Sequence, residues 1–544
     1  MKKRILIILT FVIVLLSCNK KIDDAYLSPN TFTKVEPEEL LPQIISAMAG
    51  NYSTPNAHGP LHDMRYIGQY VQNFSFYLPN SVFDRMGYTN SSGDVAQSTW
   101  RMHYYDIGQN NQRMMQWAAE QDRSHFIGVG KAIEAWSWMV LTDYYGEAPV
   151  TEAFRTDILT FKYDTEETAY NKIRSLAFEA LENLDKATGT DAKFATADQY
   201  FYGGDINKWK KFVNGILARY YNHFSNKSTY KADSAIYYAE RAMGTVDEIA
   251  AVKFAATNIA STNNYWGPFR NAFTGTATTN PTAIRQSAYI ANMMNGTNSE
   301  FTGVQDPRAW YMLRGNTNGT IVGVQNGAGQ AAITTANRPE NFFGISQATA
   351  SNTAPSSDAN CRFIFKNNSP IPVMTSAEMK FIKAEAAFKK GDKVTALQAF
   401  KDGINAHFDM LVGMYNQSIP TGKEITATNR AAYLNNTTVV PATAAGLTLS
   451  KIMMQKYIAM FGHGILETWM DMRRYHYTDL DSETGKQVYA DFRVETLDDR
   501  NKGEFVYRYF PRFNSETVWN LAELRRIGGT DENYHTKKLW IVQP

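Results

Sequence analysis

The spacing of apolar residues divides the chain into helical and irregular segments. From Val129 to Tyr144, apolar residues recur every three to four positions, and Gly146 follows as a stop signal. A break in the last predicted helix is expected at Gly462 and Gly464. The same periodicity predicts further helices over about 164–187, 208–224, 375–391, 392–404 and 449–475. The pattern as a whole predicts a mostly α fold.

Two of the predicted helices begin with capping signals. Asp164 with Glu167, and Thr375 with Glu378, have the spacing of a capping box. The segment from 375 to 404 also fits part of the 34-residue tetratricopeptide pattern, although the early Trp and the terminal Pro are missing. The matching residues are Ala384, Ala396, Phe400 and Gly403. We therefore predict a tetratricopeptide-like scaffold of helical pairs, over about 95–245 and 373–475.

Two long segments lack helical periodicity, at about 51–95 and 245–372. They are rich in Asn, Thr, Gly and Ser, as in "RGNTNGTIVGVQNGAGQ". Long irregular inserts are uncommon in a compact protein unless they are functional or disordered. Aromatic residues make up 13% of the chain, more than a core alone requires. We predict that both segments are ordered loop inserts that form a ligand-binding region.

The stretch "NNYWGPFRN" combines aromatic rings with hydrogen-bonding side chains in one loop. Flat rings pack against the C–H faces of sugars, and amide or guanidinium groups bond to the hydroxyl groups. The alternative for each ring is that it covers the helical core from a loop. "FSFYLPNSVFDRMGY" is a second aromatic stretch of the same kind. The predicted ligand-binding residues are Asn264, Tyr265, Trp266, Phe269, Arg270, Tyr77 and Trp310.

The N-terminus has the pattern of a secretion signal. An apolar run from Ile5 to Leu16 follows three basic residues and is too short to span a membrane, which takes about 20 residues. The run ends in Leu-Leu-Ser-Cys, which resembles a bacterial lipobox. We predict a signal peptide over 1–17, lipid attachment at Cys18, and a polar tether over 18–30.

Charge and motifs exclude several functions. The chain has 55 basic and 53 acidic residues, and this near-neutral balance argues against nucleic acid as a partner. The sequence contains no GxSxG, GxGxxG or GxxxxGK[ST] motif, so no cofactor and no catalytic residue is predicted. Paired carboxylates of a glycosidase have no local signature, which leaves a surface hydrolase as a less favoured alternative.

Two stretches bring together side chains of the metal-ligand type. In "HGPLHD", two histidines and an aspartate are close in sequence, but Pro60 interrupts the helix that would align them. In "DLDSETG", Asp479, Asp481 and Glu483 have calcium-loop spacing, but the required glycine comes one position late at Gly485. No metal is predicted, and a bound calcium ion remains the alternative.

Five stretches, in this order, resemble the SusD/RagB family of outer-membrane lipoproteins. They are "TWRMHYYDIGQNNQRM", "GKAIEAWSWMVLTDYYGEAPVTEA", "SAEMKFIKAEAAFKKGDKVTALQAFKDGI", "ETWMDMRRY" and "YFPRFNSETVWN". Together with the lipobox, the resemblance spans nearly the whole chain. The stretch "GHGILETW" stands where most members have EG-R, as in a divergent SusD-like subgroup.

The resemblance implies a SusD-like domain over 31–544 and a non-catalytic nutrient-binding lipoprotein on the outside of the outer membrane. Such a protein captures oligosaccharides and delivers them to a SusC-like TonB-dependent transporter. Alternatives are a peptide ligand within the same transport type, or a scaffold that binds protein through its helical pairs. The matched motif residues are interpreted as structural polar contacts: Asp471, Arg473, Arg474, Glu516 and Asn520.

Overall fold

The computed structural model describes residues 34–53, 56–89, 94–189, 191–259, 262–269, 283–346 and 354–544. Helices dominate these residues, which confirms the predicted mostly α fold. Strands are short and form two-stranded antiparallel sheets. None of the described helices has both the length and the apolar character that a membrane span requires.

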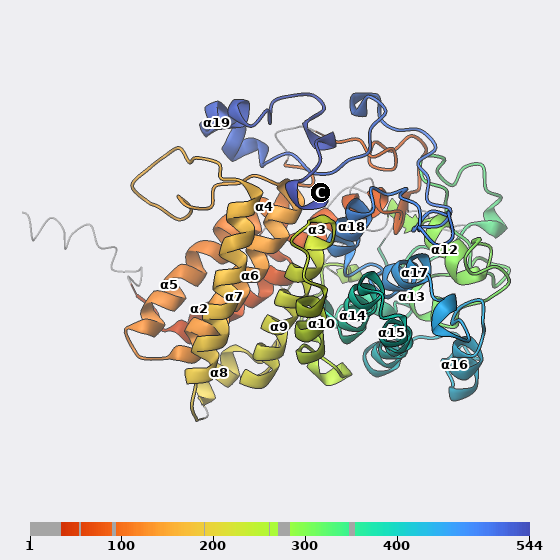
Figure 1. Ribbon diagram of the computed structural model, residues 1–544, viewed down its shortest axis with the longest axis horizontal. Helices are drawn as coiled ribbons and strands as arrows, with labels where there is room; N and C mark the ends of the chain where they lie inside the picture. The colour runs from red at the N-terminus through yellow and green to blue at the C-terminus, as the bar shows by residue number, and fades with distance from the viewer. Residues whose placement is uncertain are drawn as a thin grey trace, which may run out of the picture.

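The helices of the first half, shown in red to yellow in Figure 1, lie at its left. They are α2 (Pro37–Ala49), α3 (Pro60–Tyr70), α4 (Ser98–Arg101), α5 (Asn110–Ala119), α6 (Ser124–Tyr145), α7 (Glu166–Lys186), α8 (Ala192–Ala197), α9 (Ile206–His223) and α10 (Ala232–Arg241). Those of the second half are α12 (Ala288–Asn295), α13 (Ala309–Met312), α14 (Ser376–Lys390), α15 (Lys393–Met414), α16 (Ala427–Leu434), α17 (Leu449–Ala459), α18 (Ile465–Arg474) and α19 (Leu521–Arg526). Two further segments are π-helical, η1 (Met102–Gln109) and η10 (Phe513–Thr517).

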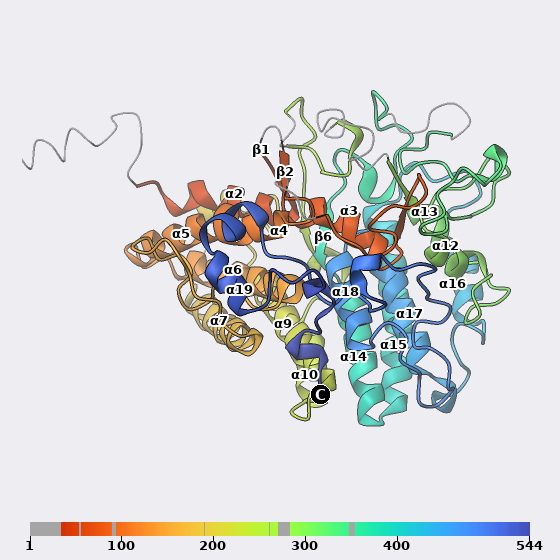
Figure 2. The same ribbon diagram turned by 90° about the horizontal axis from the view of Figure 1, so that it is seen from above.

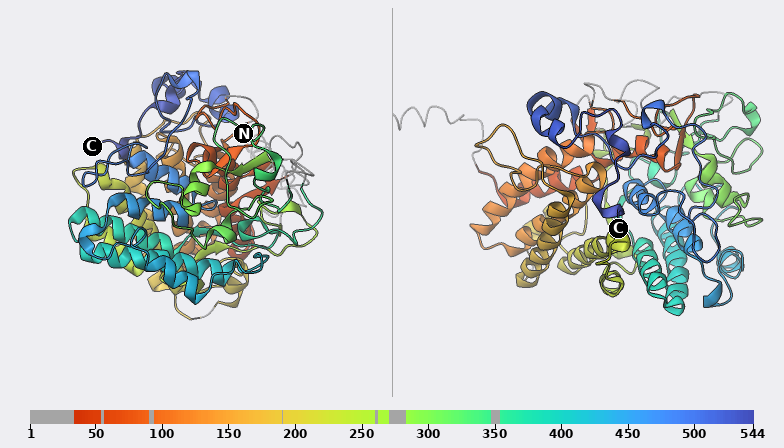
Figure 3. Two further views of the ribbon diagram at one scale, coloured as in Figure 1. Left: turned by 90° about the vertical axis from the view of Figure 1, so that its right-hand side faces the viewer. Right: turned by 45° about the horizontal axis from the view of Figure 1, so that its top comes forward.

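Helical pairs form a continuous row through the molecule. Helix α6 packs on α7, α7 on α9, α9 on α10, α10 on α14, and α14 on α15. In the right-hand view of Figure 3, these helices lie along the lower edge, and green irregular segments gather at the upper right. The row therefore forms the scaffold that the periodicity predicted.

The pair α14 and α15 shows why small residues are needed at the helical contact. Thr375 accepts a hydrogen bond from the backbone N–H of Glu378 and so begins α14. Gly391 ends α14 in the left-handed conformation, with φ of 89°. Across the pair, Gly403 lies against the ring of Phe381, where an added Cβ would come within 2.9 Å of a ring carbon. A larger residue at 403 would therefore push the two helices apart.

Two predicted boundaries differ from the structure, and one predicted break is confirmed. Helix α7 is capped by Thr165 and not by Asp164, because the Asp164 carboxylate accepts the backbone N–H groups of Val150 and Thr151 instead. Helix α15 continues ten residues beyond the predicted end, to Met414. The helix predicted over 449–475 is two helices, α17 and α18, with the expected break at the glycines between them.

The two irregular regions meet through β3 (Phe74–Phe76) and β5 (Ile284–Gln286), which pair antiparallel. In Figure 2 the red segment that follows α3 lies beside the green segments around α12 and α13. A second sheet joins β4 (Ala250–Val252) to β6 (Ile371–Met374), at the two ends of the longer region. A hairpin of β1 (Asn51–Ser53) and β2 (Asn56–His58) completes the strands of the described residues. The two regions thus form one loop-built body, but they are not wholly irregular, because α3 and α12 lie within segments that the sequence predicted to be loops.

Candidate functional site

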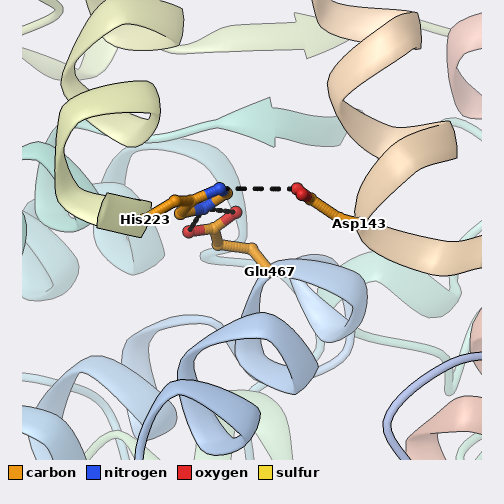
Figure 4. Close-up of side chains that lie close together, drawn as sticks. All are labelled: Asp143, His223 and Glu467. Carbon is orange, nitrogen blue, oxygen red and sulfur yellow. Dashed lines mark hydrogen bonds and ion pairs between the residues drawn. The ribbon is translucent and has the colours of Figure 1, made fainter. Parts of the chain in front are cut away.

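A cluster of charged side chains lies in the interior of the scaffold. Figure 4 shows the imidazole ring of His223 (α9) close to the carboxylates of Asp143 (α6) and Glu467 (α18). The Nε2 atom of His223 lies 3.1 Å from Glu467 Oε1, and its Nδ1 atom lies 3.6 Å from Asp143 Oδ2. Burial lowers the pKa of His223, but the charges of Glu467 and Asp143 outweigh this effect and raise it overall. The two ring nitrogens thus face opposite carboxylates, and Nδ1 also lies 3.2 Å from the Tyr170 hydroxyl group.

A histidine with two carboxylates has the chemistry of a divalent-metal site, but two cations already neutralise this one. Arg219 Nε lies 3.7 Å from Glu467 Oε2, and Lys456 Nζ lies 3.9 Å from Glu467 Oε1. A metal ion here would stand beside two fixed positive charges in a buried site. We therefore interpret the cluster as part of the scaffold.

Asp471, Arg473 and Arg474 extend the same network, whereas Glu516 and Asn520 bond to each other near Tyr163. Arg474 donates two hydrogen bonds to Glu385, of 2.6 and 3.0 Å, and one to Asp471. Lys456 Nζ lies 2.7 Å from Asp471 Oδ2. Arg473 donates to the backbone carbonyls of Asp143 and Tyr507. These contacts agree with their interpretation as structural, because they join α6, α14, α17 and α18 in the interior.

The acidic stretch that resembled a calcium loop is occupied by protein contacts. Asp481 accepts the backbone N–H groups of Ser450 and Glu483, and Asp479 lies 2.8 Å from His476 Nδ1. The Glu483 carboxylate pairs with a lysine of α15. These three carboxylates do not belong to any cluster of potential metal ligands within the described residues. In "HGPLHD", Asp63 accepts the backbone N–H groups of Ser98 and Thr99 and so caps α4.

Three of the predicted ligand-binding residues lie in the core. Trp266 is fully buried and packs against Phe74 and Phe365. The buried Asn264 side chain donates to the backbone carbonyls of Ile364 and Ser369, at 2.8 Å each. Tyr265 is 3% exposed. The structure thus corrects the expectation that these residues form a surface, because the loop folds inward to close the core.

The other predicted residues have different positions. Tyr77, Phe269 and Trp310 are half-buried, with part of each side chain at the surface. Arg270 lies outside the described residues, as do Cys18, the predicted signal peptide and the predicted tether. Of the predicted aromatics, Trp310 lines a cavity.

The Trp310 cavity has a volume of about 360 Å³ and lies between α13 and α16. Lys423 Nζ lies 4.7 Å from the centroid of the Trp310 ring. Polar side chains line the same cavity, among them Gln305, Lys423, Asn429 and Asn436. Three of these four come from a distant part of the chain, and the fourth, Gln305, lies close to Trp310 in a stretch that no motif marked. The cavity therefore combines one flat ring with several polar groups, which is the arrangement that saccharide binding requires.

A second polar cavity of about 440 Å³ lies where the two irregular regions meet. Asn80, Arg85, Gln325 and Asn326 are among its lining residues. Asp84 also lines it and accepts hydrogen bonds from the side chains of Ser75 and Asn326 and from the backbone of Phe76 and Gly327. Burial raises the pKa of Asp84 to about 7, in spite of these donors. The only sequence signal near this cavity was the abundance of turn residues in both regions. That signal did not indicate that the two regions pair with each other.

Comparisons with known proteins agree with this architecture. A family model described as "Starch-binding associating with outer membrane" matches residues 29–493. A SusD/RagB family protein from Bacteroides thetaiotaomicron is 20% identical, with a TM-score of 0.64 and coverage of 94% of this chain and 99% of that one. A SusD homologue from Bacteroides fragilis is 18% identical, with a TM-score of 0.62 and coverage of 94% and 100%. A chitin-binding protein is 18% identical, with a TM-score of 0.68 and the same coverage. Comparison with curated proteins gives no match.

Proposed function

Because the chain belongs to the SusD-like family of starch-binding proteins associated with the outer membrane, as its motifs predicted, we propose that it is a non-catalytic glycan-binding lipoprotein. Lipid on Cys18 holds it at the outer face of the membrane. It captures oligosaccharides and delivers them to a SusC-like TonB-dependent transporter, over which the helical body closes as a lid.

The observation that carries the proposal is the Trp310 cavity. The indole ring offers an apolar face for the C–H groups of a sugar ring, and the Lys423 ammonium group makes a cation–π contact with the ring. Gln305 and Asn436 supply amide groups at the edge of the cavity for hydroxyl groups of the ligand. Affinity is expected to be modest, because desolvation of the many hydroxyl groups offsets the gain from stacking.

The test is binding of maltoheptaose and chitohexaose to the purified chain by isothermal titration calorimetry. We expect Trp310→Ala to weaken binding about tenfold, the scale of one lost stacking contact. The matched control is Trp519→Ala, because Trp519 is 72% exposed and lies outside the Trp310 cavity. Equal binding by both variants would contradict the assignment of the site.

Two other outcomes would redirect the proposal. Loss of peptide binding in Trp310→Ala, with no binding of either oligosaccharide, would favour a peptide ligand. Release of shorter oligosaccharides during incubation would identify a hydrolase and contradict the non-catalytic function. Co-purification of the chain with a large β-barrel would support the transporter as its partner.

A further inference from the structure

A third cavity, of about 440 Å³, lies in the other half of the molecule from Trp310. It is near α4 at the left of Figure 1, whereas α13 and α16 lie at the right. Its walls come from η1, from the loop that follows α6, and from η10. The aromatic side chains that line it are Trp100, Tyr104, Tyr105, Phe154 and Phe161.

Both ends of this cavity are built on π-helical backbone. η1 supplies Tyr104 and Tyr105, and η10 supplies Ser515 and Glu516. π-Helical turns are rare and occur frequently at functional sites, because they redirect side chains that a regular helix would place elsewhere. Two such segments at one cavity, from distant parts of the chain, are an independent indication of a binding site.

The aromatic walls are held in place by the surrounding structure. The Trp100 ring meets Tyr145 edge-on and stacks on Tyr163 with an interplanar angle of 27°. The hydroxyl group of Tyr104 donates to the carbonyl of Pro149 at 2.8 Å. Gly108 leaves room for the Phe154 ring, because a Cβ at position 108 would clash with that ring. The cavity is therefore preformed, which lowers the entropy that a ligand must lose on binding.

Among the charged groups around the cavity, one guanidinium is only loosely paired. Arg512 lies 2.7 Å from Asp94 Oδ2, and Arg155 is paired with Asp157 in its own loop. The nearest carboxylate oxygen to Arg101, on Asp106, is 3.9 Å away. Within the described part of the chain, the buried Nε of Arg101 has no hydrogen-bond acceptor. Such a donor is costly to leave unpaired, so an acceptor from a ligand would be stabilised here.

The Glu516 carboxyl group lies at the wall of the cavity and is held by two hydrogen bonds. Glu516 Oε2 accepts hydrogen bonds from the Tyr163 hydroxyl group and from the Asn520 amide. Burial raises the pKa of Glu516 above its usual range, which favours its neutral form more than exposure would. Gln109 and Ser515 line the cavity as well and offer groups that bond to hydroxyls.

We propose that this cavity is a second binding site, for a sugar ring that carries a carboxylate, as in a uronic acid residue of a glycan. The carboxylate meets the Arg101 guanidinium, the ring lies against Trp100 and Phe154, and its hydroxyl groups face Gln109 and Ser515. A neutral sugar would leave the Arg101 donor unpaired. An inorganic anion would leave the aromatic walls uncovered. This site goes beyond the proposed neutral-glycan site and does not depend on the Trp310 cavity.

The test compares trigalacturonate with neutral galactotriose by isothermal titration calorimetry on the full chain carrying Cys18→Ala. We expect the acidic sugar to bind at least about tenfold more tightly, and Arg101→Gln to remove that difference, as loss of one charge-assisted contact implies. The matched control is Arg113→Gln, an exposed arginine on the adjoining α5, which should bind both sugars as the parent chain does. Equal binding of the two sugars by the parent chain would overturn the proposal, as would unchanged preference in Arg101→Gln.

Three further measurements test whether the acidic sugar binds in this cavity and whether the cavity selects a sugar. Tyr105→Ala changes a side chain that is 64% exposed and stacks under Arg101, so it should fold normally and weaken trigalacturonate binding about threefold. Loss of trigalacturonate binding in Trp310→Ala would place the acidic sugar in the other cavity and overturn a second site. Equally tight binding of phenylacetate or of inorganic phosphate would show that the site does not select a sugar, and would overturn the ligand class.

Discussion

The scaffold and the loop-built body bury polar groups in different proportions. In the helices, backbone groups already bond to each other, and many buried side chains pair by charge, as Arg474 does with Glu385. In the irregular regions, many backbone carbonyls have no helical partner, and side-chain amides, together with buried arginines such as Arg314, supply the donors. Asn264 and Asn326 both donate to backbone carbonyls of distant segments. Much of the asparagine in these regions therefore holds the loops together, and its abundance alone does not indicate a ligand.

The largest effect is expected from breaking charge pairing in the scaffold. Glu385 accepts two hydrogen bonds from Arg474, one from Asn222 and one from Tyr475. Glu385→Gln leaves the buried guanidinium undercompensated, so the free energy of unfolding should fall by about 3–5 kcal/mol. Urea denaturation measures this change. The exposed Glu182→Gln, which loses only a pair with Lys186 one turn away, should cost less than about 0.5 kcal/mol.

An intermediate effect is expected from breaking an amide contact in the loops. Asn264→Ala leaves the carbonyls of Ile364 and Ser369 without their donor, which should cost about 1–3 kcal/mol in urea denaturation. The control is Asn368→Ala, because Asn368 is exposed and lies between Ile364 and Ser369 in the sequence. A loss in Asn264→Ala as large as that in Glu385→Gln would contradict the distinction between the two regions.

The smallest effect concerns the pH dependence of stability. Burial acts to raise the pKa of Glu385, but the charge and hydrogen bonds of Arg474 outweigh it and hold the pKa well below the usual range. The unfolded chain therefore takes up this proton first as pH falls, and the stabilisation is lost below about pH 4.3. Between pH 6 and 3.5, the difference in unfolding free energy between the parent and Glu385→Gln should shrink by about 1 kcal/mol.

The same titration on Asn264→Ala tests whether the loop contact is independent of charge. The amide does not ionise, so the cost of this substitution should stay constant over that pH range. A pH-dependent cost would show that the loop region shares the ionic network of the scaffold.

The sequence predicted the long amphipathic helices because a period of three to four residues indicates burial of one face, but it missed α3 and α12 in the segments predicted as loops. It also predicted the ends of α6 at Gly146 and of α14 at Gly391, and the small residues at the contact between α14 and α15. It did not distinguish Trp266 from Trp310, which lie in similar polar stretches. Trp266 is buried and Trp310 lines a cavity because each contacts a segment that is distant in the sequence, at Phe365 and at Lys423 respectively. The cavities themselves depend on such distant pairings, and no local pattern encodes them.

The hydrogen bonds around Asp84 have a consequence for protein engineering. One carboxyl group joins the turn after β3 to the segment at Asn326 and Gly327. Transfer of the polar surface at this junction to another member of the fold would therefore require both segments and Asp84 as one unit. Exchange of either segment alone would separate the two donors at Asn326 and Gly327 from the Asp84 carboxyl group.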